Sequence, residues 1–393
     1  MSRLLVLRLV PLLMRPAAVV LEGALLSDGY ILILLMPVAM MALTISSIPV
    51  HLDYFRSHAG MAGHIRLGQI YSSAFSWLTL VSLMVLAGLL MVLPLGFSPL
   101  LISAICLTFL IEKLADETCR TLEFSKAFVK WFLVQSLRSG WFILPVGVSL
   151  TGADYGDSFL AFAGLILILM ALAFLRVTGL RPRLGLDGMA EIRTNLVFLA
   201  GSLLSAGYVQ LPRLLVAKLF PEQAHVYLAT TQLCQGASLI FSVQYQIPYR
   251  KIIARRPKLF QRRMWPTMRR LLVPVVLTAI LYLAGDASSL LAYPSRDIVQ
   301  VALLLPILTA DTLMLVVLSA HLGYLQWFVG KYSAFMTYLI CIGTAGLWAA
   351  LLVSSGLWQA LSLLAVPALT ILTGAVWLFI VIMRYFRRSP LHG

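Results

Sequence analysis

The sequence predicts an all-α, polytopic membrane protein with about 12 transmembrane helices, arranged as two six-helix lobes that are related by a parallel repeat. Three observations lead to this fold class: the composition, the distribution of basic residues and an internal repeat. Of the 393 residues, 61% are hydrophobic and 11% are charged, and the mean hydropathy is +0.94. Soluble domains are roughly half apolar and about a quarter charged. The composition therefore excludes a soluble fold.

The apolar residues fall into stretches that are long enough to cross a bilayer. A helix needs about 20 apolar residues to span the hydrocarbon core, and short polar breaks separate stretches of that length along the chain. The first stretch, "MSRLLVLRLVPLLM", resembles a signal sequence, but no small-residue cleavage site follows it, so we expect it to be retained. The expected spans are 4–26, 31–51, 68–93, 97–118, 128–150, 157–176, 194–218, 224–247, 270–291, 298–320, 331–354 and 359–383.

The basic residues are distributed as expected for a chain with both termini in the cytoplasm. Cytoplasmic loops of membrane proteins collect Lys and Arg, and this topology leaves only Arg213, Lys218 and Arg296 of the 30 basic residues elsewhere. The net charge of +15 is therefore largely a topology signal. The segment "YRKIIARRPKLFQRRMWPTMRR" is expected to face anionic membrane lipids, and nucleic acid is not an expected partner.

Two segments of the chain resemble each other at an offset close to half its length. The segment from Arg15 to Arg56 aligns with the segment from Pro212 to Arg250, and Pro16 then stands opposite Pro212. Parallel repeats of this kind recur in transporters. The predicted organisation is a lobe over 1–180, a cytoplasmic linker over 181–193 and a second lobe over 194–393. Chance similarity between two apolar hairpins is the alternative.

Basic side chains inside the spans mark a candidate substrate site. A charged group deep in hydrocarbon costs roughly 2.5–3.5 kcal/mol, so it persists where it faces water, a partner or a ligand. Arg15, Arg138 and Arg213 are predicted to face a cavity between the lobes, and Gln210 lies one turn before Arg213 on the same helix face. Lys218 is a further candidate. Snorkelling to the outer surface is the alternative for Lys218 and for Arg213.

Acidic residues in the spans fall into two groups. Glu112, Asp116 and Arg120 follow one another at four-residue intervals, which predicts a salt-bridge stripe with an i,i+4 pair between Asp116 and Arg120. Asp311 lies well inside a late span and is the candidate for coupling to protons or sodium ions. A structural aspartate, hydrogen-bonded to neighbouring threonine hydroxyls, is the alternative for Asp311.

The residues point to an anionic substrate and to no cofactor. The four cysteines form no CxxC pair and have no histidines clustered beside them, so neither disulfides nor a metal site is expected. No GxxxxGK[ST] nucleotide-binding loop is present. Several basic groups and few acids lie within the spans, and the planar guanidinium fork matches the oxygens of phosphate.

Three segments carry a resemblance to a known family. They are "LLSDGYILILLMPVAMM", "EKLADETCRTLEFSKAFVKWFLVQSLRSGWF" and "PRLLVAKLFPEQAHVYLATTQL". In these segments the chain resembles bacterial Wzx-type lipid-linked polysaccharide (O-antigen) flippases of the multidrug/oligosaccharidyl-lipid/polysaccharide export superfamily, over most of residues 1–270. The resemblance implies two six-helix lobes around a cationic cavity, in which Arg15, Arg138 and Arg213 hold the pyrophosphate of a lipid-linked glycan.

We therefore expect a multi-pass flippase of the bacterial inner membrane that moves an undecaprenyl-diphosphate-linked oligosaccharide to the outer leaflet without covalent chemistry. A glycan polymerase and glycosyltransferases are its candidate partners. The first alternative is a drug or small-molecule exporter of the same superfamily, for which an acidic cavity would be expected. The second is an integral-membrane glycan polymerase or acyltransferase, although the expected outer loops are short and His321 stands alone.

Overall fold

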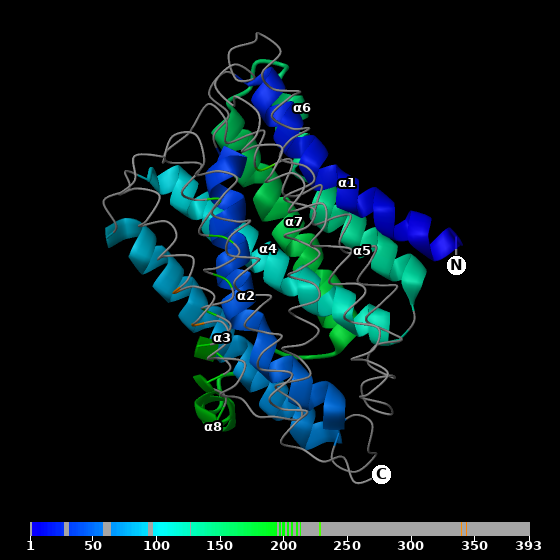
Figure 1. The fold of residues 1–393 in the computed structure, drawn as a ribbon, viewed down its shortest axis with the longest axis vertical. Helices are drawn as coiled ribbons and strands as arrows, with labels where there is room; N and C mark the ends of the chain where they lie inside the picture. The colour runs from blue at the N-terminus through cyan, green and yellow to red at the C-terminus, as the bar shows by residue number, and fades with distance from the viewer. Residues whose placement is uncertain are drawn as a thin grey trace, which may run out of the picture. The chain divides into compact units, whose positions relative to one another are not determined.

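The computed structural model describes residues 2–26, 31–57, 64–92, 97–125 and 127–194, with single positions at 196, 197, 199, 200, 203, 206, 210, 213, 228, 339 and 343. Within these residues every regular element is an α-helix and no strand occurs (Figure 1), so the all-helical prediction is confirmed for them. The helices are α1 (Ser2–Leu25), α2 (Ile31–Ser57), α3 (His64–Val92), α4 (Pro99–Phe124), α5 (Phe128–Gly140), α6 (Ile143–Ser149), α7 (Tyr155–Thr178) and α8 (Leu186–Thr194).

The first six predicted spans all fall on helices. Five of them coincide with one helix each, namely α1, α2, α3, α4 and α7, whereas the span predicted over 128–150 is divided into α5 and α6. The predicted spans from 194–218 onward lie almost wholly outside the described residues. The number of spans, the repeat and the two lobes therefore stay predictions. The chain divides into two compact units, Met1–His225 and Val226–Gly393, and the helices described below belong to the first.

The division between α5 and α6 follows from a proline. Pro145 has no N–H to donate to the carbonyl of Trp141, four residues before it. That carbonyl accepts instead from the N–H of Leu144, three residues on, at 3.0 Å. The two aromatic side chains of this turn are buried, because the ring centre of Trp141 lies 4.2 Å from that of Phe142 and 5.0 Å from that of Phe159 on α7.

Two of the described helices are long and apolar enough to cross a membrane: the stretch Ile70–Met91 of α3, and α7. Both present large apolar side chains at their surfaces, for example Met84 on α3, which is 66% exposed, and Ile168 on α7, which is 61% exposed. An apolar surface of this kind is costly in water and is compatible with lipid. The fold therefore indicates an association with a membrane.

The ends of α7 are determined by local sequence. The side chain of Asp154 accepts from the N–H of Asp157 at 2.9 Å and caps the helix at its start. Gly179 ends the helix in the left-handed conformation, with φ of +65°, which a residue without a Cβ adopts at little cost. Asp157 in the first turn and Arg176 in the last turn complement the helix dipole.

Helix α4 lies at the centre of the described part of the chain. It packs against α7, α2, α5 and α3 (Figure 1), and its side chains Ile105, Phe109 and Ile111 are fully buried. Helix α1 packs instead along α5 and α6 and makes few contacts with α2. A polar residue on almost any face of α4 therefore meets another helix, and this positions the candidate site.

The segment between α7 and α8, residues 179–185, is hydrogen-bonded to side chains of α3. Gly185 is held through its carbonyl, which accepts from the Ser73 hydroxyl at 2.8 Å and from Trp77 Nε1 at 3.1 Å. Helix α8 follows at once and lies against α3, and Gly188 is the residue of closest approach. A Cβ at Gly188 would stand 2.6 Å from the backbone nitrogen of Ala74. The segment predicted as a linker over 181–193 thus carries a helix that is packed on the bundle.

We expect Gly188→Ala to destabilise the protein by about 1–3 kcal/mol, because the added methyl overlaps backbone atoms of α3 that cannot rotate away. Gly164, in the middle of α7, is the matched control, since no atom lies within 4 Å of a Cβ built there. Gly164→Ala should be neutral or stabilising by up to about 1 kcal/mol. Thermal unfolding of the detergent-purified variants measures both, and equal midpoints would contradict the close approach.

Candidate functional site

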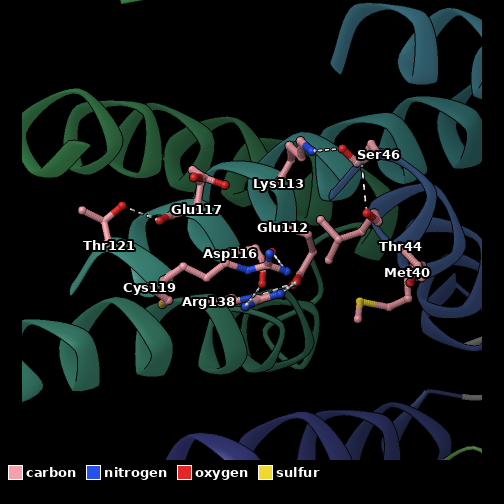
Figure 2. A network of polar contacts seen from close by, with 12 residues as sticks. Met40, Thr44, Ser46, Glu112, Lys113, Asp116, Glu117, Cys119, Thr121 and Arg138 are labelled. Atoms are coloured by element: carbon pink, nitrogen blue, oxygen red, sulfur yellow. Dashed lines mark hydrogen bonds and ion pairs between the residues drawn. The ribbon is translucent and has the colours of Figure 1, made fainter. Parts of the chain in front are cut away.

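A buried glutamate on α4 is bound by two arginines that come from different helices. The carboxyl group of Glu112 has no exposed surface. Its Oε1 atom pairs with Nη2 of Arg15 on α1, and its Oε2 atom accepts from Nε of Arg138 on α5 at 2.7 Å and lies 2.6 Å from Nη2 of the same residue. Figure 2 shows the side chains of Glu112 and Arg138 pointing toward each other between their helices. We refer to Arg15, Glu112 and Arg138 as the arginine–glutamate triad.

The triad is a strong constraint because its charges are removed from water. A buried ion is costly unless oppositely charged and hydrogen-bonding partners surround it. Glu112 satisfies this condition on both oxygens, and each arginine shares the same negative charge. The three residues together carry one net positive charge, so the site attracts an anion.

The triad continues along α4 into the predicted stripe. Asp116 lies one turn after Glu112 and pairs with Arg120 at 2.7 Å, so the predicted i,i+4 pair is confirmed. Asp116 also lies 3.5 Å from Nη1 of Arg138. Figure 2 shows Glu112 and Asp116 on the same side of α4 as Arg138. The stripe is therefore joined to two further helices rather than limited to α4.

The guanidinium N–H groups of Arg138 have more oxygen acceptors than those of Arg15. All three nitrogens of Arg138 face oxygens, because Nη1 also lies 3.5 Å from Oε1 of Gln135. Arg15 pairs with an oxygen through Nη2, whereas its Nη1 meets the sulfur of Met40 at 3.8 Å. Its Nε is buried and has no hydrogen-bond acceptor among the described residues. A thioether is a weak acceptor, so Arg15 has capacity for additional oxygen ligands.

A second polar cluster lies on the face of α4 that is turned to α2 and α3. Lys113 donates to the carbonyl of Ser46 on α2 at 2.5 Å, and its ammonium stands 5.2 Å from the centre of the Phe75 ring on α3. Glu117 accepts a hydrogen bond from the hydroxyl of Tyr71, also on α3. Lys113 and Glu117 are buried, so α4 carries charged groups into the packed interior on two neighbouring faces, about 100° apart around the helix.

A third buried acid joins the ends of three helices. Glu22, near the end of α1, accepts from the N–H of Leu32 at the start of α2 at 3.0 Å. The same oxygen accepts from the hydroxyl of Tyr155 at the start of α7 at 2.9 Å. A carboxylate at the first turn of a helix interacts favourably with its dipole, so Glu22 acts as a cap that α2 receives from another helix.

Of the six residues predicted for substrate binding and ion coupling, the structure brings four together in two separate pairs. Arg15 and Arg138 meet on Glu112. Arg213 and Gln210 are buried and contact each other, with Nη1 of Arg213 donating to Oε1 of Gln210 at 2.9 Å, as the shared helix face predicted. Lys218 and Asp311 lie outside the described residues. The described residues contain no cluster of metal-binding side chains, and Cys106 and Cys119 form no disulfide within them.

Neither the pairing of Glu112 with Arg15 and Arg138 nor the cluster around Lys113 and Glu117 was predicted from the sequence. The spacing contained a signal for both. Glu112 with Asp116, and Lys113 with Glu117, are two i,i+4 sets offset by one residue, which places charges on two faces of a helix. Two charged faces in an apolar context indicate burial against neighbours on both sides.

Comparisons of the chain with protein-family models, with curated proteins and with solved structures gave no match. The site is therefore interpreted from its own geometry: a buried and net positive group of charges, next to helices that are apolar at their surfaces.

We expect Glu112→Leu to destabilise the protein by about 3–5 kcal/mol, because two buried guanidiniums lose their shared counter-charge. Adding Arg138→Met should recover part of that loss by removing one of the unpaired charges. Denaturant unfolding of the wild type, of the two single variants Glu112→Leu and Arg138→Met, and of the double variant measures the coupling. Asp157→Leu, at an exposed position of α7, is the control and should cost at most about 1 kcal/mol. Strictly additive losses for Glu112→Leu and Arg138→Met would contradict the pairing.

Proposed function

We propose that the protein is a multi-pass flippase of the bacterial inner membrane. It moves an anionic undecaprenyl-diphosphate-linked oligosaccharide from the cytoplasmic to the outer leaflet by alternating access, and no covalent bond is made or broken. The resemblance of its motifs to Wzx-type flippases suggests this activity. The arginine–glutamate triad supplies the physical support for it.

The observation that carries the proposal is the net positive charge of the triad, which is buried and has a surplus of donors. Two guanidiniums carry about ten N–H groups, whereas one carboxylate offers about four lone-pair positions. A diphosphate brings several oxygens of high charge density and matches the guanidinium fork. A buried group of this kind binds an anion more strongly than an exposed one, since water screens it less.

The remaining candidate residues have roles that follow from their charge. Arg15, Arg138 and Arg213 supply the positive charge for the diphosphate, and Gln210 and Lys218 contribute further donors. Asp311 couples transport to protons or sodium ions. The prenyl chain stays in the bilayer, where the exposed apolar sides of helices such as α3 and α7 also belong. Rocking of the two predicted lobes exposes the site first to one side of the membrane and then to the other.

A second candidate is an exporter of organic cations, because three buried acids, Glu22, Glu112 and Glu117, lie in the described helices. Each of them already accepts hydrogen bonds from side chains of the protein: Glu22 from Tyr155, Glu112 from the two arginines and Glu117 from Tyr71. Their negative charge is thus directed at internal donors. The surplus donors lie on Arg15, which favours the anion.

We expect Arg213→Lys and Arg213→Ala both to reduce glycan export by at least about tenfold, since a charged bidentate hydrogen bond contributes roughly 1.5–3 kcal/mol and an ammonium cannot reproduce it. The measurement is complementation of export in a strain that lacks this gene, with each variant present in the membrane at the wild-type level.

The matched control for Arg213 is Arg183→Ala. Arg183 is an exposed arginine that is paired with Asp187 at 3.3 Å, and its loss should leave export unchanged. Full export by Arg213→Ala would show that this arginine does not bind the substrate. Full export by Arg213→Lys together with loss in Arg213→Ala would mean that only the charge matters, as expected for a topology determinant.

The proposed topology places both termini and the basic segment around Lys258 in the cytoplasm, and the turn before α7 outside. In a cysteine-free background, a single cysteine at Asp154 should react with a membrane-impermeant maleimide in intact cells. A cysteine at Lys258 should react only after the cells are permeabilised. The opposite pattern would invert the proposed orientation of every helix.

A further inference from the structure

We propose that Glu112 is an internal counter-anion that competes with the phosphate of the substrate for Arg15, while Arg138 remains bound to Glu112 throughout. In the state described here Glu112 occupies the position of an anion on Arg15. Binding of a diphosphate transfers Arg15 from the carboxylate to phosphate oxygens, and release of the diphosphate returns it. The inference rests on the proposed function for the identity of the anion.

The geometry assigns different tasks to the two arginines. Arg138 contacts Oε2 of Glu112 through two nitrogens, at 2.6 and 2.7 Å, and its third nitrogen lies between Asp116 and Gln135 at 3.5 Å from each. Its movement would break all of these contacts at once. Arg15 holds Glu112 through one nitrogen only, and its side chain is 17% exposed compared with 10% for Arg138. Arg15 is thus the arginine that changes partner more easily.

The donors of Arg15 are better satisfied by a phosphate than by its present surroundings. Its Nη1 faces the sulfur of Met40, and its Nε has no acceptor among the described residues. Two phosphate oxygens can receive Nε and an Nη together as a fork. The exchange therefore replaces one ion pair by a better-matched one, and the buried donor gains an acceptor.

The presence of two arginines on one acid explains why the exchange leaves no buried charge unpaired. If Arg15 were the sole partner of Glu112, its departure would leave a buried carboxylate without a counter-charge, which is costly because the carboxylate has lost its hydration. Arg138 remains on Oε2, so Glu112 stays paired while Arg15 is bound to the substrate. The triad with a bound phosphate then has a positive group next to each negative one.

The packing around Arg15 restricts the exchange to its side chain. Met14, the preceding residue, approaches α5 so closely that a Cβ at Gly140 would lie 2.9 Å from its sulfur. The guanidinium of Arg15 also lies 5.9 Å from the centre of the Phe142 ring. Helix α1 is therefore held against the turn between α5 and α6 at this level, and a rotation of the Arg15 side chain is the movement that remains.

The test compares anion binding by variants of the full-length protein in lipid nanodiscs, with inorganic pyrophosphate and farnesyl diphosphate as the probes. Glu112→Gln keeps the size of the side chain and removes the competing charge, so we expect both probes to bind at least about tenfold more tightly. Glu117→Gln is the matched control. It makes the same change five residues further along α4, on the face turned to Tyr71, and should alter affinity less than about threefold.

Two arginine variants test the division of tasks. Arg15→Lys should weaken the binding of both probes by about tenfold, because an ammonium provides no fork. Arg138→Lys should lower the thermal midpoint of the protein by more than Arg15→Lys does, because an ammonium cannot keep both contacts to Oε2 of Glu112. Equal thermal midpoints for the two variants, or a larger loss of affinity in Arg138→Lys than in Arg15→Lys, would overturn the assignment. An equal gain of affinity in Glu117→Gln and Glu112→Gln would overturn it too.

A measurement on the wild-type protein keeps the proposal testable if Glu112→Gln fails to fold. Farnesyl diphosphate should protect Arg15 from modification by phenylglyoxal, as followed by peptide mass spectrometry, and absence of protection would overturn the exchange. If pyrophosphate binds more tightly to Glu112→Gln than to the wild type, but the wild type does not export the glycan, the exchange holds and the proposed substrate is wrong. If the wild type exports the glycan and Glu112→Gln gains no affinity for the probes, the proposed flippase function holds and the exchange is wrong. Absence of probe binding by the wild type would refute both.

Discussion

A carboxylate without exposed surface, held between two guanidiniums, is the interaction on which the described part of the fold depends. Glu112 brings α1 and α5 to the same level of α4, although Arg15 is 97 residues and Arg138 is 26 residues away from it along the chain. Apolar packing alone places helices next to one another with little preference for register, because one aliphatic contact resembles the next. A buried ion pair has a single good geometry, so it determines how far each helix extends along its neighbour.

The same helix contacts α2 and α3 through charges on its other side. Lys113 reaches a backbone carbonyl of α2, and Glu117 reaches a tyrosine of α3. The interior of the first unit therefore contains polar contacts on both sides of α4, where the outer helices α3 and α7 are apolar at their surfaces. Buried charges that are paired with one another, together with apolar side chains at the surface, are compatible with a bilayer. They also provide a charged interior in which an ionic ligand replaces an internal partner.

Much of the local structure could be predicted from the sequence, whereas the contacts between helices could not. Apolar stretches of bilayer length identified the helices, and the four-residue spacing identified the pair of Asp116 with Arg120, because both signals are local. The break before Pro145 was missed, since the stretch is apolar on both sides of it and only the missing N–H interrupts the helix. The triad was missed for a different reason. Periodicity assigns a residue to a face of its own helix and contains no information about which distant helix lies opposite. Arg15 and Arg138 were predicted to face a cavity between the lobes, and Glu112, the acid that both of them bind, was assigned to a stripe within α4.

The charge content of α4 also has a consequence for how the protein is made. Helix α4 is not one of the two described helices that are long and apolar enough to cross a membrane. Each charged side chain at the centre of an inserting helix costs about 2.5–3.5 kcal/mol. Its acids gain Arg138 only after α5 has been synthesised, and they gain Arg15 from a helix that left the ribosome earlier. In the proposed multi-pass topology, α4 therefore inserts more favourably together with α5, which carries its basic partner, than alone. The order of the helices along the chain, with the basic partner directly after the acidic helix, favours this joint insertion.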